Sequence, residues 1–163
     1  MDFSFSNLAG FRKILDFQNR ASDNGLYNLG TALDFFPTTS GSGVFSADVL
    51  ARVVLTRDSG TGTVTGYVNG AQQISFNDSG SIAVFGAPNN IIRFFEDDFA
   101  TGQSEASAGR ATEIQIYNGA LASGDVRLLG GPGEIPSGVP EPAALTLVGF
   151  GLLSLGLVRR LKA

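Results

Sequence analysis

The stretch TVTGYVNGAQQISFND, from Thr63 to Asp78, contains the clearest fold signal of the chain. Apolar and polar residues alternate on both sides of the pair Asn69-Gly70. An Asn-Gly connection between two β-rich runs favours a type I′ turn, because both of its residues need positive φ. The stretch therefore predicts a β-hairpin, with strands in 63–70 and 71–78.

The same short alternations, separated by turn residues, extend over residues 1–129 and predict an antiparallel β-sandwich. Residues 19–25 and 37–43 are expected to be turn and loop, and 120–130 could form one helical turn. No opening strand is evident before residue 12. Further strands are expected at 12–17, 33–36, 48–58, 90–97 and 110–119.

Composition excludes several classes of function. The 163 residues include 22 Gly and 13 Phe but no Cys and no His, which removes disulfides, metal sites built on Cys or His, and a Ser-His-Asp triad. Residues 1–138 hold 8 Lys and Arg against 14 Asp and Glu. This acidic body argues against nucleic acid as a partner, since phosphate binding needs a basic face.

The C-terminal part has a different character. Residues 130–142 contain four of the six prolines and predict an extended, accessible linker. Residues 143–158 carry no charge, and a helix over them would span about 24 Å, short for a bilayer core but workable. The basic residues that follow favour the cytoplasmic side. We expect one membrane-spanning helix, with a buried core helix as the alternative.

The order of linker, Pro-Glu-Pro, apolar helix and basic end resembles the PEP-CTERM sorting signal of exported Gram-negative bacterial proteins. This resemblance implies recognition by an exosortase, removal of the helix, and delivery to the cell surface or extracellular matrix. The expected organisation is a body at 1–129, a linker at 130–138 and a sorting segment at 139–163. The matching residues are Val139, Pro140, Glu141, Pro142, Arg159 and Arg160.

Within the body, Tyr67-Val68-Asn69-Gly70, Asp97-Asp98 and Ile114-Gln115-Ile116-Tyr117 make the chain similar to the second half of a LamG-like domain. The resemblance implies a concanavalin A-like jelly roll that binds glycan or extracellular polymer and often holds calcium near the sheet rim. The start, MDFSFSNLAGFRK, lacks the apolar core of an export signal. We expect the native N-terminus to lie upstream and the body to expose a sheet edge.

The best candidate for a binding site is the acidic segment 93–109. Its carboxylates, with carbonyl oxygens of Asn89 and Asn90, suit Ca²⁺, which takes 6–8 oxygen ligands. A solvated acidic loop is the alternative. A second candidate, Asp23 and Asn24, is expected to be a turn capped by its own side chains. The proposed calcium ligands are Glu96, Asp97, Asp98 and Glu105.

Catalysis is not expected. Glucanases of concanavalin-like folds use paired carboxylates two residues apart, whereas Glu96, Asp97 and Asp98 are contiguous and would alternate between faces. Trp is absent, so a sugar platform would need Tyr or Phe, and Phe is favoured as core. We expect a surface adhesion or matrix protein; the alternatives are a carbohydrate-active enzyme and an unprocessed single-pass membrane protein. The aromatic candidates are Tyr67, Tyr117, Phe94 and Phe99.

Overall fold

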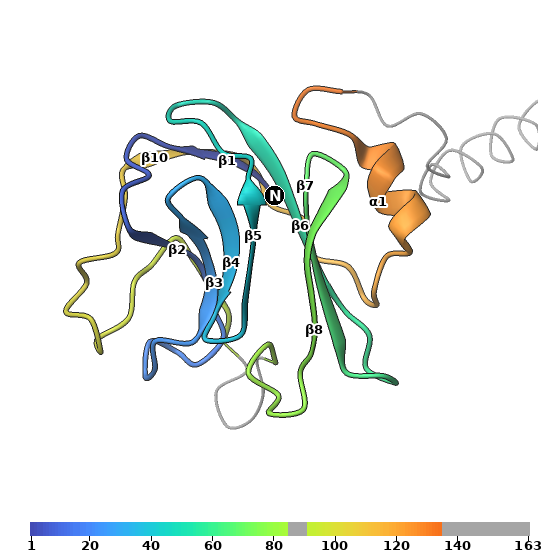
Figure 1. Ribbon diagram of the computed structural model, residues 1–163, viewed down its shortest axis with the longest axis horizontal. Coiled ribbons are helices and arrows are strands. Elements are labelled where there is room, and N and C mark those ends of the chain that lie inside the picture. The colour runs from blue at the N-terminus through green and yellow to red at the C-terminus, as the bar shows by residue number, and fades with distance from the viewer. Residues whose placement is uncertain (85–90, 135–163) are drawn as a thin grey trace, which may run out of the picture.

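The computed structural model describes residues 1–84 and 91–134, which form two antiparallel sheets packed face to face (Figure 1). The first sheet has the strand order β10-β1-β6-β7-β8 and the second the order β5-β4-β3-β2-β9. The expected all-β sandwich is confirmed. The first sheet comprises β1 (Asp2–Phe5), β6 (Ala51–Arg57), β7 (Thr63–Val68), β8 (Ala71–Asn77) and β10 (Gly109–Glu113). The second comprises β2 (Phe11–Asp16), β3 (Gly25–Leu29), β4 (Ala32–Phe36), β5 (Thr39–Gly43) and β9 (Arg93–Phe94).

The β7–β8 hairpin forms as its sequence predicts. Val68 pairs with Ala71, and the connecting Asn69 and Gly70 have φ of 49° and 79°. The Asn69 side chain also accepts a hydrogen bond of 2.8 Å from the backbone N–H of Arg52 on β6. The turn is therefore fastened to the neighbouring strand as well as to its own.

The core lies between the two sheets and is built from side chains that alternate inward along the strands. Phe35 on β4 and Phe76 on β8 meet across the interface, with ring centroids 4.8 Å apart. Phe3, Phe5 and Phe95 form a second aromatic group, with Phe3 5.0 Å from Phe5 and 5.1 Å from Phe95. Most of the phenylalanines thus serve packing, as the composition suggested.

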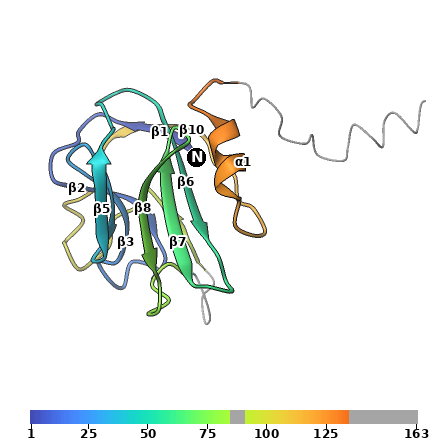
Figure 2. The same ribbon diagram turned by 45° about the vertical axis from the view of Figure 1, so that its right-hand side comes forward.

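Among the described residues one short helix, α1 (Ser123–Leu129), packs on the outer side of the first sheet (Figure 2). Its Val126 is completely buried, and the backbone of Arg127 lies against the hairpin turn at Gly70. The helical turn expected in 120–130 is confirmed. None of the described helices is long and apolar enough to cross a membrane. The helix expected at 143–158 lies outside the described residues.

Several strand predictions were wrong in extent. Strand β1 opens the chain, although no opening strand was evident, because the alternating run DFSF is only four residues long and all four are buried. Strand β5 occupies most of the segment expected to be a loop, since β4 offers it a pairing edge. Two other strands are shorter than expected: β9 covers only two residues of the segment 90–97, and β10 ends at Glu113 rather than near residue 119. The strand β3 was not foreseen either.

Candidate functional site

Three carboxylates from two loops converge next to the second sheet. Asp23 lies in the connection between β2 and β3, whereas Asp98 and Glu105 lie in the connection between β9 and β10. One carboxylate oxygen from each residue lies within 4.8 Å of those of the other two. We refer to Asp23, Asp98 and Glu105 as the acidic cluster. Such a set of hard oxygen donors is what a divalent cation such as Ca²⁺ prefers.

Lys13 of β2 places an ammonium group beside this cluster. Its Nζ has no solvent exposure and donates to Asp98 Oδ2 at 2.9 Å and to the backbone carbonyl of Asn24 at 3.3 Å. It also bonds the Tyr27 hydroxyl, and Asp16 Oδ2 lies 3.8 Å away. Because a buried charge is stable only when paired, Lys13 supplies the positive charge that these buried carboxylates require.

One lysine does not balance the carboxylates around it. Burial, followed by the charges of Asp23, Asp97 and Asp98, raises the pKa of Glu105 to about 7. Burial alone would also raise the pKa of Asp98, but hydrogen bonds from Lys13 and from backbone N–H groups lower it. Above neutral pH the surroundings of Lys13 therefore carry surplus negative charge, which favours an additional cation.

Three buried carboxylate oxygens have no hydrogen-bond partner among the described residues, namely Asp16 Oδ2, Asp34 Oδ1 and Glu105 Oε2. Buried polar atoms in folded proteins are almost always hydrogen-bonded, so each such atom needs an explanation. Glu105 is itself a member of the acidic cluster, and its Oε2 is the unpartnered oxygen. This oxygen is therefore a ligand atom still available to a cation.

Asp97 has a different role, since its carboxylate organises the loop backbone. Its Oδ1 accepts the N–H of Asp98 at 2.9 Å, and its Oδ2 accepts the N–H of Glu105 at 2.8 Å and the hydroxyl of Thr101 at 3.3 Å. These bonds tie together the two loop positions that carry the cluster. Asp97 thus positions Asp98 and Glu105.

Glu96 is not part of the acidic cluster and forms ion pairs with two arginines. It accepts hydrogen bonds from Arg20 at 2.6 Å and from Arg93 at 2.8 Å. The guanidinium of Arg20 stacks over the ring of Phe99, 3.9 Å from its centroid, and that ring is 65% exposed. This surface pairing uses both carboxylate oxygens of Glu96.

The structure therefore divides the four expected calcium ligands. Asp98 and Glu105 come together, Asp97 supports them, and Glu96 is engaged by Arg20 and Arg93. Asp23 joins the cluster, although its sequence context indicated only a capped turn. No spacing rule links Asp23 to residues some 75 positions later; only the packing of the β2–β3 turn against the late loop brings them together. Asn89 and Asn90 lie outside the described residues.

The aromatic candidates for a sugar platform are also separated. Tyr67 is buried, and Phe94 packs against the core. Phe99 and Tyr117 are exposed, at 65% and 48%. The exposed pair comes from different segments, and Phe99 already stacks with Arg20. Their arrangement defines no common platform.

Comparison with known proteins yields no match to a family model, to a curated protein or to a solved structure. The function must therefore be inferred from the residues and their geometry. The expected sorting residues lie outside the part of the chain that the structure describes: Val139, Pro140, Glu141, Pro142, Arg159 and Arg160.

Proposed function

We propose that this chain is an exported bacterial protein of the cell surface or extracellular matrix, whose β-sandwich binds a glycan or other extracellular polymer. The order of linker, Pro-Glu-Pro, apolar run and basic end supports export and processing by an exosortase. The two-sheet architecture and the hairpin at Asn69-Gly70 support a LamG-like jelly roll. The acidic body is in keeping with partners other than nucleic acid.

The acidic cluster is the structural observation that supports a binding function. We propose that it takes Ca²⁺, with Asp23, Asp98 and Glu105 as protein ligands. The unpartnered Glu105 Oε2 and the surplus of carboxylates over the single Lys13 both favour this. A bound divalent ion would neutralise the cluster and hold the β2–β3 turn against the loop before β10.

Thermal melting of the full chain in mild detergent tests the calcium site. CaCl₂ should raise the melting temperature over that in EDTA, because a ligand that binds only the folded state stabilises it by mass action. The rise should be lost in Glu105→Gln and Asp98→Asn and kept in Asp125→Asn, a carboxylate in the first turn of α1. Equal melting temperatures in CaCl₂ and EDTA would mean that the cluster binds no calcium and is a loop neutralised by Lys13.

Export and processing are tested on the protein recovered from the cells that make it. Intact-mass spectrometry should find a chain that ends near Pro142, without the apolar run. A chain that retains Ala163 would instead support the single-pass membrane protein, in which residues 143–158 stay in the bilayer.

An enzyme on the same fold is the second candidate. Environments that push the pKa values of neighbouring carboxyls apart are typical of acid–base pairs, and Glu105 and Asp98 shift in opposite directions. However, Asp98 is completely buried and bonded to Lys13, and none of the three cluster residues lines the cavity of about 1140 Å³ beside the first sheet. Hydrolysis of a β-glucan that disappears in both Glu105→Gln and Asp98→Asn would establish the enzyme instead.

A further inference from the structure

Strand β6 is paired on one side along most of its length and on the other only at its start. Residues Val53 to Arg57 pair with β7. On the opposite side, β1 pairs with Arg52 and Ala51, and Met1 exchanges two backbone hydrogen bonds with Val53, of 2.8 and 3.0 Å. Beyond Val53, no strand of the described chain lies on that side.

The open side of β6 presents backbone groups that have no strand partner in the part of the chain that the structure describes. In an antiparallel ladder, hydrogen-bonding direction alternates from residue to residue. Since both backbone groups of Val53 bond Met1, those of Leu55 and Arg57 point the same way, beyond the end of β1. An unpaired strand edge of this kind is a template for another strand.

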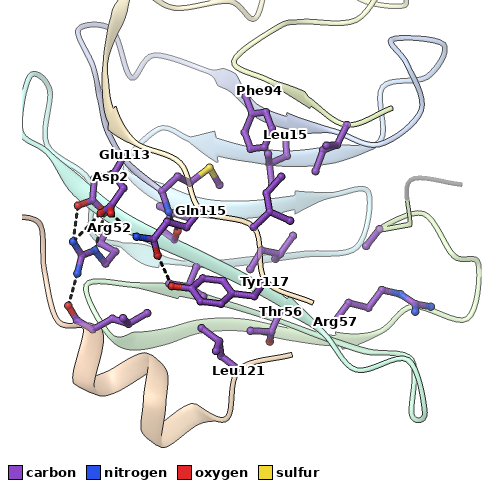
Figure 3. A pocket seen from close by; sticks show the side chains of 18 of the residues that line it. Asp2, Leu15, Arg52, Thr56, Arg57, Phe94, Glu113, Gln115, Tyr117 and Leu121 are labelled. Atoms are coloured by element: carbon purple, nitrogen blue, oxygen red, sulfur yellow. Dashed lines mark hydrogen bonds and ion pairs between the residues drawn. The ribbon is translucent and has the colours of Figure 1, made fainter. Parts of the chain in front are cut away.

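A cavity of about 1140 Å³ lies along this edge (Figure 3). Leu15 and Phe94, from the facing sheet, line it on one side, and Thr56, Tyr117 and Leu121 line it on the other. The gap therefore reaches from the core to the outer face of the first sheet. An opening through both faces of a sheet is what a strand would fill, because its side chains project alternately to the two faces.

The far wall of the cavity is the segment that follows β10. Asp2 of β1 pairs with Glu113, the last residue of β10, so residues 114–117 continue alongside the path that β1 would take if extended. Ile116 is 70% exposed and Ile114 45% exposed. The sequence of this segment predicts a strand, yet it has no partner among the described residues. A single additional strand would pair both with residues 114–117 and with the open side of β6.

We propose that one further β-strand occupies this groove. It lies between β6 and residues 114–117, runs in line with β1 and is joined directly to Met1 on its N-terminal side. Continuity with the β1–β6 and β1–β10 ladders selects this occupant. A small ligand could fill the cavity but would not pair both rows of backbone groups. This proposal is independent of the calcium site.

The register of the missing strand follows from Met1 opposite Val53. The second residue before Met1 would lie opposite Leu55, and the fourth opposite Arg57. Directly opposed residues share a face, and Val53 and Leu55 belong to the core side. The second and fourth positions should therefore be apolar, whereas the first and third face outward over Val54 and Thr56.

Three versions of the full chain test this, each extended by four residues before Met1 and kept in mild detergent. Val-Thr-Val-Thr places valine at the second and fourth positions, Thr-Val-Thr-Val has the same composition in the opposite phase, and Gly-Ser-Gly-Ser is a flexible control. Amide hydrogen exchange at Leu55 and Arg57 reports strand pairing, and that at Val64 of β7, which is paired on both sides, reports global stability.

The Val-Thr-Val-Thr chain should exchange the Leu55 amide at least about tenfold more slowly than the Gly-Ser-Gly-Ser chain, and melt about 5 °C higher. The Thr-Val-Thr-Val chain should gain less, because a one-residue phase change sends its valines outward. Equal exchange at Leu55 in all three chains would overturn the proposal. So would slowing at Val64 alone, since the extension would then act without entering the groove.

Discussion

At the scale of single residues, Lys13 determines whether the acidic cluster can exist without a metal. Its ammonium is buried and bonded to Asp98, to Tyr27 and to the carbonyl of Asn24. The hydroxyl of Tyr27, raised in pKa by burial and by Asp23, stays protonated and donates to that carboxylate in turn. The lysine and the tyrosine together hold carboxylates of two loops, Asp23 and Asp98, in place.

Replacement of Lys13 by Met should therefore cost about 3–5 kcal/mol of unfolding free energy in EDTA, since it leaves buried carboxylates without their partner. Calcium should restore part of this loss if the cluster binds it. Urea unfolding of the full chain measures both quantities, with Arg110→Met on exposed β10 as the control. A Lys13→Met protein as stable as the control in EDTA would show that the lysine does not neutralise the cluster.

Glu105 should make stability depend on pH. Its pKa is about 7 in the folded chain against an ordinary value of 4.5, so between these values the folded state holds more protons than the unfolded state. The free energy of unfolding contributed by Glu105 is therefore present below pH 4.5 and is lost as pH rises toward 7.

Urea unfolding of the wild type and Glu105→Gln from pH 4.5 to 8 isolates this contribution. The wild type should lose stability relative to the variant across the window, and saturating CaCl₂ should reduce the loss. Parallel stability curves for the two proteins would mean that Glu105 titrates as an ordinary surface carboxyl.

At the scale of elements, the β7–β8 hairpin depends on a glycine for two reasons. Gly70 has φ of 79°, and a Cβ at this position would lie 3.3 Å from the backbone of Arg127 in α1. Gly70→Ala should therefore cost about 1–2 kcal/mol, because it combines a left-handed backbone with a tight contact.

A matched control lies on α1 itself. Gly124 has open space around its Cα and no positive φ, so Gly124→Ala should stabilise the protein by up to about 1 kcal/mol through helix propensity. Chemical denaturation compares the two variants. If both variants change the free energy of unfolding in the same direction, the turn geometry at Gly70 does not determine the effect of its substitution.

At the scale of the whole molecule, stability comes from the contact between the sheets rather than from exposed aromatics. Phe35 is fully buried and meets Phe76 of the other sheet, whereas Phe99 is 65% exposed over Arg20. Phe35→Ala should cost about 3–5 kcal/mol, and Phe99→Ala should stay within about 1 kcal/mol of the wild type. Calorimetric melting measures both; similar losses would mean that Phe99 takes part in the core.

Local patterns in the sequence were enough for the sandwich class, for the β7–β8 hairpin and for the helical turn that became α1. Each depends on residues close together in the chain: the Asn69-Gly70 turn demands a particular backbone, and alternation places one face of each strand inward. Strands with a weak local signal, such as the four-residue β1 and the Gly- and Ser-rich β5, could not be recognised because neighbouring strands supply the reason for their extended form.

For the candidate site, too, the sequence predicted one part and the tertiary structure determined the rest. The carboxyl-rich segment 93–109 was evident from composition, and with it Asp98 and Glu105. Only the tertiary structure decided that Glu96 pairs with arginines, that Asp97 supports the loop, and that Asp23 and Lys13 complete the cluster. Sequence proximity determines local backbone conformation, but which charges meet depends on how distant loops pack, and the free energy of a buried charge depends on every neighbour that folding brings to it.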